Sequence, residues 1–122
     1  MKILLIEDEI LIQKSLQRLL EKKGAQVDVA SQGRDAIEMI KANDFDRIVC
    51  DLMLKDITGF DVIEESKSKY SIDDISKRFV IITAYSSEQV LEKARKYNCL
   101  VLNKPFENTI KAIQIMLGED VE

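Results

Sequence analysis

Short runs of β-branched and aliphatic residues alternate along the chain with longer segments in which apolar residues recur every three or four positions. The short runs predict buried strands, whereas the longer period predicts amphipathic helices. Alternation of the two is typical of a parallel sheet whose strands are joined by crossover helices. The pair occurs five times, so we expect an α/β fold of the (βα)5 type, doubly wound, as one domain spanning residues 1–122.

Glycines and polar residues between these segments indicate where the predicted strands and helices begin and end. The predicted strands are Lys2 to Ile6, Gln26 to Ala30, Arg47 to Asp51, Arg78 to Thr83 and Cys99 to Asn103. The predicted helices are Glu9 to Lys23 with Ile12, Leu16, Leu19 and Leu20 facing the core, Gly33 to about Ala42, one after Gly59 that carries Val62 and Ile63, Ser86 to Tyr97, and Asn108 to Leu117. The polar stretch Lys67 to Lys77 is predicted to be a helix end followed by a loop.

Composition places the chain among folded globular domains, with 46% hydrophobic residues, 33% charged residues, one proline and four glycines in 122 residues. The first apolar run ends at Glu7, which is too soon for a signal peptide, and no run approaches the roughly 20 residues that cross a bilayer. Cys50 and Cys99 lie in apolar runs and are expected to be buried free thiols in a reducing compartment. We therefore expect a cytoplasmic protein that does not bind a membrane.

Charge and the absence of histidine exclude several functions. The net charge of −4 provides no basic surface for nucleic acid, so direct nucleic-acid binding is not expected. Without histidine, the chain holds no Ser-His-Asp or Cys-His nucleophile and no histidine-ligated zinc. The remaining ligands for a divalent cation are oxygens, which favour Mg²⁺.

Polar residues stand at the ends of four predicted strands. Glu7 and Asp8 follow the first strand, Asp51 ends the third, Thr83 ends the fourth and Lys104 follows the fifth. In parallel α/β sheets ligands bind outside the carboxyl ends of the strands, so these side chains are expected to face one site. Three carboxylates and one lysine leave a charge of −2, which a divalent ion would neutralise.

A simpler interpretation of the same acids remains open at this point. Acidic residues after a strand can complement the N-terminus of the following helix, and Asp51 could be an ordinary residue at a strand end. The combination of acids at two strand ends with a threonine and a lysine at two others favours the shared site.

Four motifs make the chain similar to a known family. They are Leu5-Ile6-Glu7-Asp8-Glu9, Ile48-Val49-Cys50-Asp51-Leu52-Met53, Thr83-Ala84, and Lys104-Pro105-Phe106. In this order and spacing they resemble the receiver domains of two-component response regulators, and the resemblance covers nearly the whole chain. It implies a flavodoxin-like fold with strand order 2-1-3-4-5.

The resemblance also implies a function. Asp51 would take a phosphoryl group from a phosphohistidine on a sensor histidine kinase or a histidine phosphotransfer protein. Lys104 would pair with the phosphoryl group, and the Thr83 hydroxyl would move to bind it, shifting the fourth helix and the fifth strand. The ligands of Mg²⁺, or of Mn²⁺ in its place, would be Glu7, Asp8, Asp51 and the backbone carbonyl of Met53.

The chain departs from the family pattern at a few positions. Val101 stands where the family usually has an aromatic switch residue, and Tyr85 is either a substitute reporter or a solvent-facing loop residue. Glu7 replaces a common aspartate, and Lys55 stands near the place of a common proline.

Surface residues suggest little about partners. Ile10 and Leu11 lie outside the predicted core stripe of the first helix and would form either a docking patch beside the site or isolated apolar positions. A solvated charged surface is expected from Lys93, Lys96, Lys111, Glu119, Asp120 and Glu122.

Other functions fit the sequence less well. A flavin phosphate would be repelled by the acids after the first strand, and an aspartyl-phosphate phosphatase would need a second acid where Met53 stands. An enzyme with its own external substrate is therefore not expected. The stronger alternative is a receiver-like interaction module that is never phosphorylated. The sequence is compatible with a single-domain regulator and with a domain of a hybrid kinase or of a larger regulator.

Overall fold

The computed structural model describes residues 1–119 and contains a five-stranded parallel sheet of order β2-β1-β3-β4-β5. This confirms the predicted strand order. The strands are β1 (Lys2–Ile6), β2 (Gln26–Ala30), β3 (Arg47–Asp51), β4 (Phe79–Thr83) and β5 (Leu100–Asn103).

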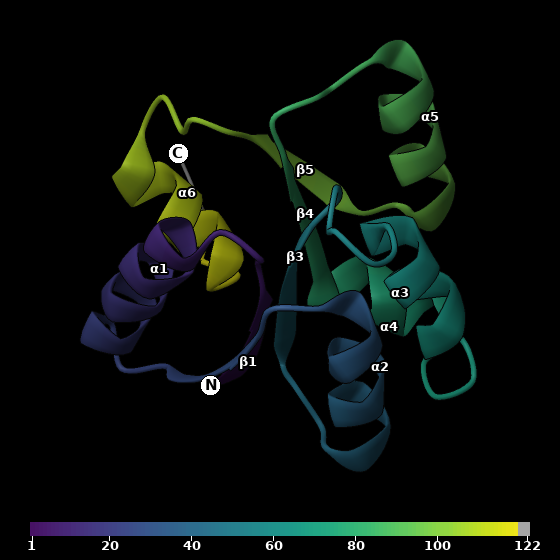
Figure 1. Cartoon of the computed structure of the whole chain (residues 1–122), viewed down its shortest axis with the longest axis horizontal. Helices are drawn as coiled ribbons and strands as arrows, with labels where there is room; N and C mark the ends of the chain where they lie inside the picture. Colours follow the sequence, from purple (N-terminus) through teal and green to yellow (C-terminus); the bar gives the residue numbers. More distant parts are fainter. Residues whose placement is uncertain (120–122) are drawn as a thin grey trace.

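Among the described residues, six helices cover the two faces of the sheet. Helices α1 and α6 lie on one face, and α2, α3, α4 and α5 lie on the other (Figure 1). Their bounds are α1 (Ile10–Lys22), α2 (Gly33–Ala42), α3 (Gly59–Ser66), α4 (Ile72–Arg78), α5 (Glu88–Tyr97) and α6 (Thr109–Met116). Most boundaries fall within one or two residues of those predicted.

Helix α4 corrects the prediction for residues 67–77, which were expected to form a helix end and a loop. Ser71 caps the helix, because its Oγ accepts a hydrogen bond of 3.1 Å from the amide of Asp74. Two acids in the first turn and two basic residues in the last turn suit the helix dipole. Only Ile75 is buried among its seven residues, so the helix lacks the apolar period that would have revealed it.

The sheet lies between two hydrophobic cores, because successive side chains of each strand point to opposite faces. Ile48, Cys50 and Ile81 face α2 to α5, whereas Val49, Val80 and Ile82 face α1 and α6. All six are fully buried, as are the four apolar residues of β1 after Lys2. Burial on both faces leaves the carboxyl ends of the strands as the place where polar side chains emerge.

Helix α1 packs on the second core with the predicted apolar stripe, although its four residues are buried to different degrees. Leu16 and Leu20 are buried, but Ile12 and Leu19 are only partly buried. Gln13 takes the remaining buried position of this face. No helix within residues 1–119 is long and apolar enough to cross a membrane.

Candidate functional site

Three carboxylates meet at the carboxyl ends of β1 and β3. These strands are neighbours in the sheet, with Ile6 in register with Cys50. Glu7 and Asp8 directly follow β1 and Asp51 ends β3, and each contributes an oxygen that lies within 4.8 Å of the others. The side chains of Glu7 and Asp51 are almost completely buried, whereas Asp8 is partly exposed.

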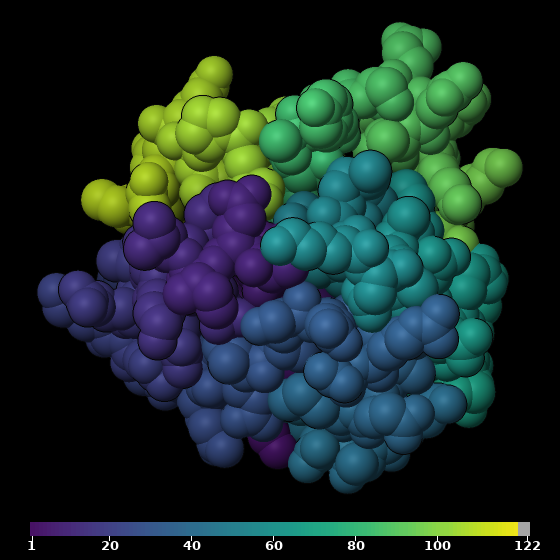
Figure 2. Space-filling model, in the orientation of Figure 1, coloured from purple at the N-terminus to yellow at the C-terminus, as the bar shows by residue number. Residues whose placement is uncertain are grey.

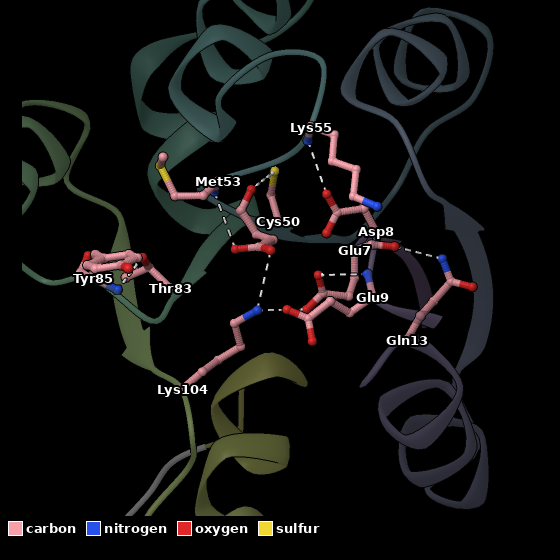
Figure 3. Close-up of polar contacts among 11 residues, drawn as sticks. Glu7, Asp8, Glu9, Gln13, Cys50, Met53, Lys55, Thr83, Tyr85 and Lys104 are labelled. Carbon is pink, nitrogen blue, oxygen red and sulfur yellow. Dashed lines mark hydrogen bonds and ion pairs between the residues drawn. The ribbon is translucent and has the colours of Figure 1, made fainter. Parts of the chain in front are cut away.

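Lys104 brings a positive charge to the two buried acids from the end of β5. Its Nζ donates hydrogen bonds to Glu7 Oε1 at 2.9 Å and to Asp51 Oδ2 at 3.3 Å (Figure 3). The backbone amide of Lys104 donates to the carbonyl of Thr83 at 2.8 Å, which continues the pairing of β5 with β4. The lysine side chain is 11% exposed, so the ion pairs are largely shielded from solvent.

Burial and mutual repulsion perturb the titration of this cluster. Desolvation, followed by the hydrogen bond with Asp51, raises the pKa of Glu7 to about 7, although Lys104 opposes the rise. Burial alone would lower the pKa of Lys104, but its hydrogen bond to Glu7 and the charge of Asp51 outweigh burial and raise it. The site therefore disfavours a second buried negative charge until a further cation arrives.

The segment 52–58 between β3 and α3 faces the acids. The amide of Met53 donates to Asp51 Oδ1 at 3.3 Å, and the amide of Lys55 donates to Asp8 Oδ2 at 3.0 Å. Met53 also pairs with Thr58 in an isolated antiparallel bridge, which folds the segment back on itself. The backbone of Met53 thus lies beside Asp51, where its carbonyl was predicted to serve as a metal ligand.

Thr83 is buried at the end of β4, but its hydroxyl forms hydrogen bonds with the backbone of Tyr85 and not with the acidic cluster. Oγ1 accepts from the amide of Tyr85 and donates to the carbonyl of Tyr85, both at 2.9 Å. The Tyr85 side chain is 71% exposed, as expected of the solvent-facing alternative. Val101 is partly buried against the core beneath α5.

The surface predictions hold where the structure describes them. Ile10 and Leu11 are exposed, and Leu11 lines a groove of about 340 Å³ between α1 and the segment after β5. Both cysteines are free, as expected, but only Cys50 is buried; the prediction of burial is wrong for Cys99, which lies between α5 and β5 and is partly exposed. Lys93, Lys96, Lys111 and Glu119 are exposed, and Asp120 and Glu122 lie outside the described residues.

Two polar residues that the sequence prediction missed support the cluster. Gln13 is buried, and its Nε2 donates to the backbone carbonyl of Glu7 at 2.9 Å and to Ser31 Oγ at 3.3 Å. Its spacing from the buried Leu16 could have revealed it. The Asp56 carboxylate accepts from backbone amides at the start of α2, more than 20 residues away in the sequence, and no local pattern indicates that contact.

The donors of the cluster fit a hard divalent cation. All the side-chain ligands that Glu7, Asp8 and Asp51 can offer are carboxylate oxygens, which suit Mg²⁺ better than a softer metal. One cation would also stabilise the ionised form of Glu7, whose pKa is raised mainly by burial and further by the neighbouring Asp51.

Comparison with known proteins decides the family. A sequence model described as the response regulator receiver domain matches residues 3–114. The chain belongs to this family. Receiver domains act with histidine kinases or phosphotransfer proteins in two-component signalling, and they generally bind Mg²⁺ at an acidic pocket.

Individual relatives agree with this assignment. The chain is 32% identical over 117 residues to the aerobic respiration control sensor protein ArcB of Escherichia coli, covering 96% of the chain and 15% of ArcB. The non-phosphorylated HemR receiver domain of Leptospira biflexa is 28% identical with a TM-score of 0.81, and the match covers 96% of this receiver domain and 90% of that chain.

A response regulator of Burkholderia pseudomallei, solved with a phosphorylated aspartic acid, a calcium ion and citrate, is 26% identical with a TM-score of 0.79. The match covers 94% of this receiver domain and 65% of that chain.

Proposed function

We propose that this receiver domain is a phosphoacceptor in two-component or phosphorelay signalling, with Asp51 as the residue that is modified. The observation that carries the proposal is the convergence of three carboxylates from two strands with Lys104 from a third. Burying several like charges together destabilises a protein. Such groups are therefore found mainly at functional sites. Phosphoryl transfer does require it, because the acids position a metal ion and one of them is the nucleophile.

In this mechanism an Asp51 carboxylate oxygen attacks the phosphorus of a phosphohistidine on the partner. The bond between that oxygen and phosphorus forms while the bond between phosphorus and the imidazole nitrogen breaks, and the leaving imidazole takes up a proton. Lys104 Nζ, 3.3 Å from Asp51 Oδ2, is placed to pair with a phosphoryl oxygen. The chain has no histidine, so the donor must come from another domain or protein.

The metal ligands follow from the same geometry. We assign Glu7, Asp8, Asp51 and the backbone carbonyl of Met53 to Mg²⁺, with Mn²⁺ as a substitute. The ion supplies positive charge that neutralises the phosphoryl oxygens during transfer. Glu7 and Asp51 remain fixed by Lys104, and Asp8 is oriented by the amide of Lys55.

The proposed signal is a rearrangement around α5. The Thr83 hydroxyl would exchange its bonds with the Tyr85 backbone for a bond to a phosphoryl oxygen, moving the segment that leads into α5. Only Ala94 and Tyr97 are buried among the ten residues of α5, so few apolar contacts oppose its displacement relative to β5.

The partners follow from this chemistry. We propose a sensor histidine kinase or a histidine phosphotransfer protein as donor and a protein as the downstream target, in the cytoplasm and without direct nucleic-acid or membrane binding. The chain would have no external substrate of its own, and would catalyse only its own phosphorylation and dephosphorylation.

Incubation with acetyl phosphate and Mg²⁺, followed by intact mass measurement, tests the proposal. We expect the wild type to gain one phosphoryl group and Asp51→Asn to gain none. Asp28→Asn removes a carboxylate from β2, away from the acidic cluster, and should be modified like the wild type. A wild type that stays unmodified would support the interaction module that is never phosphorylated.

Gly59→Ala is expected to slow phosphorylation because the backbone of Asp51 passes close to Gly59. An added Cβ would lie 3.0 Å from the carbonyl oxygen of Asp51 and 3.2 Å from Leu52 Cα, so the β3 end must shift. We expect a loss of about 1–3 kcal/mol in the free energy of unfolding and a phosphorylation rate at least about tenfold lower.

Gly24→Ala is the matched control, because Gly24 has a positive φ of 94° but open space around it and precedes the amino end of β2. It should cost about 1–2 kcal/mol without slowing phosphorylation. Equal rates for the two variants would show that the close approach at Gly59 does not position Asp51.

A further inference from the structure

The N-terminus of α2 is held by a side chain from the segment beside the acidic cluster. Within residues 1–119, the cap of α2 comes from Asp56 and not from Gln32, the residue at its N-cap position. Asp56 Oδ1 accepts from the amide of Gly33 at 2.9 Å, and Oδ2 accepts from the amide of Arg34 at 3.0 Å. The carboxylate thus satisfies two amides that the helix itself leaves free.

Ile57, the residue after Asp56, packs against Gly33 at the start of α2. A Cβ added at Gly33 would lie 2.5 Å from Ile57 Cγ1, so the segment and the first turn of α2 approach as closely as glycine allows. Figure 2 shows the blue start of α2 in contact with the teal segment that leads into α3, beside the purple residues after β1.

The anchored segment is the one that carries the backbone groups of the site. It extends from Met53, whose amide contacts Asp51, through Lys55, whose amide contacts Asp8. The bridge between Met53 and Thr58 closes it into a short loop, so a tether at its middle restrains both ends.

We propose that Asp56 is a positioning residue for the metal site: by capping α2 it holds the 52–58 segment so that the Met53 carbonyl and Asp8 stay in place for the divalent cation. This inference rests on the proposed function. Residues that orient metal ligands typically contribute a factor of about 10 to 100 in metal affinity. Because coupling is reciprocal, a cation at the site must in turn strengthen the contact between Asp56 and α2.

Isothermal titration with Mg²⁺ tests the proposal on the wild type, Asp56→Ala and Asp56→Asn. We expect Asp56→Ala to bind Mg²⁺ about tenfold more weakly, with Asp56→Asn in between because the amide oxygen still accepts a hydrogen bond. In the acetyl phosphate reaction, the Mg²⁺ concentration for half-maximal rate should rise by the same factor. The rate at saturating Mg²⁺ should change less than about threefold, since Asp56 is not assigned a contact with the phosphoryl group.

Two variants control for other causes. Asp35→Asn removes an exposed carboxylate from the first turn of α2 and measures the effect of charge alone. Ser71→Ala removes the cap of α4 and measures the effect of a lost cap elsewhere in the fold. Both should bind Mg²⁺ within about twofold of the wild type.

The outcomes separate the two proposals. A wild type that binds no Mg²⁺ would refute the proposed metal site itself. The role of Asp56 would be overturned if the wild type binds Mg²⁺ and Asp56→Ala binds it with the same affinity. It would also be overturned if Asp56→Ala and Asp35→Asn weaken Mg²⁺ binding by the same factor. If the variants do not fold, amide exchange at Gly33 and Arg34 in the wild type decides: exchange that slows with Mg²⁺ supports the coupling, and unchanged exchange overturns it.

Discussion

Replacing Lys104 with methionine is expected to lower the free energy of unfolding by about 3–5 kcal/mol at pH 8 in magnesium-free buffer. The lysine is 11% exposed and hydrogen-bonds to two buried carboxylates, so its loss leaves Glu7 and Asp51 facing each other without a cation. Chemical denaturation measures the loss. Added Mg²⁺ should stabilise this variant more than the wild type, because the ion replaces the missing positive charge.

Lys55→Met is the matched control for Lys104→Met. It removes the same charge from the edge of the site, but Lys55 contacts Asp8 through its backbone amide, which the substitution retains. We expect a change below about 1 kcal/mol. Equal effects of the two substitutions would show that the buried ion pairs of Lys104 contribute nothing specific to stability.

Glu7→Gln is expected to stabilise the magnesium-free protein, and the gain should grow as the pH rises from about 4.5 to 7 and then level off. The pKa of Glu7 is about 7 in the folded protein, above the ordinary value of 4.5. Between these pH values the folded state holds a proton that the unfolded chain has released, so stability falls as pH rises from about 4.5 to 7. Glutamine removes this decline, for a difference on the order of 3 kcal/mol at pH 8.

Denaturation curves at pH 5, 6, 7 and 8 measure the effect, with Glu9→Gln as the control. Glu9 is exposed on the same turn, and its substitution should change the free energy of unfolding by less than about 0.5 kcal/mol throughout. Saturating Mg²⁺ should reverse the order of wild type and Glu7→Gln, because the variant lacks a metal ligand. A pH-independent difference would contradict the burial of a strained negative charge at Glu7.

The fold could be predicted because the strands carry an unusually simple signal. β1, β3 and β4 are buried on both faces, so their sequences are nearly continuous apolar runs that end in polar residues. Helix α4 gives no such signal: it buries one residue and depends on the cap by Ser71 and on its charge distribution. Short polar helices of this kind depend on local hydrogen bonds and tertiary context, which hydrophobic periodicity does not describe.

The candidate site was predictable to the extent that topology determines it. Residues that end neighbouring parallel strands must lie at one edge, and this brings Glu7, Asp8 and Asp51 together with Lys104. Topology does not determine where each side chain points: the Thr83 hydroxyl, at the end of β4, forms hydrogen bonds with the backbone of Tyr85. The support from Asp56 depends on a contact between segments more than 20 residues apart, which one sequence without relatives does not reveal.

The most direct test of the phosphoacceptor claim locates the modified residue. The protein is treated with acetyl phosphate and Mg²⁺, reduced with borohydride, which converts an aspartyl phosphate into homoserine, and mapped by tandem mass spectrometry. We predict homoserine at position 51 in the magnesium-treated sample and aspartate there when Mg²⁺ is withheld. Homoserine at position 8 or elsewhere, with position 51 unchanged, would contradict the account.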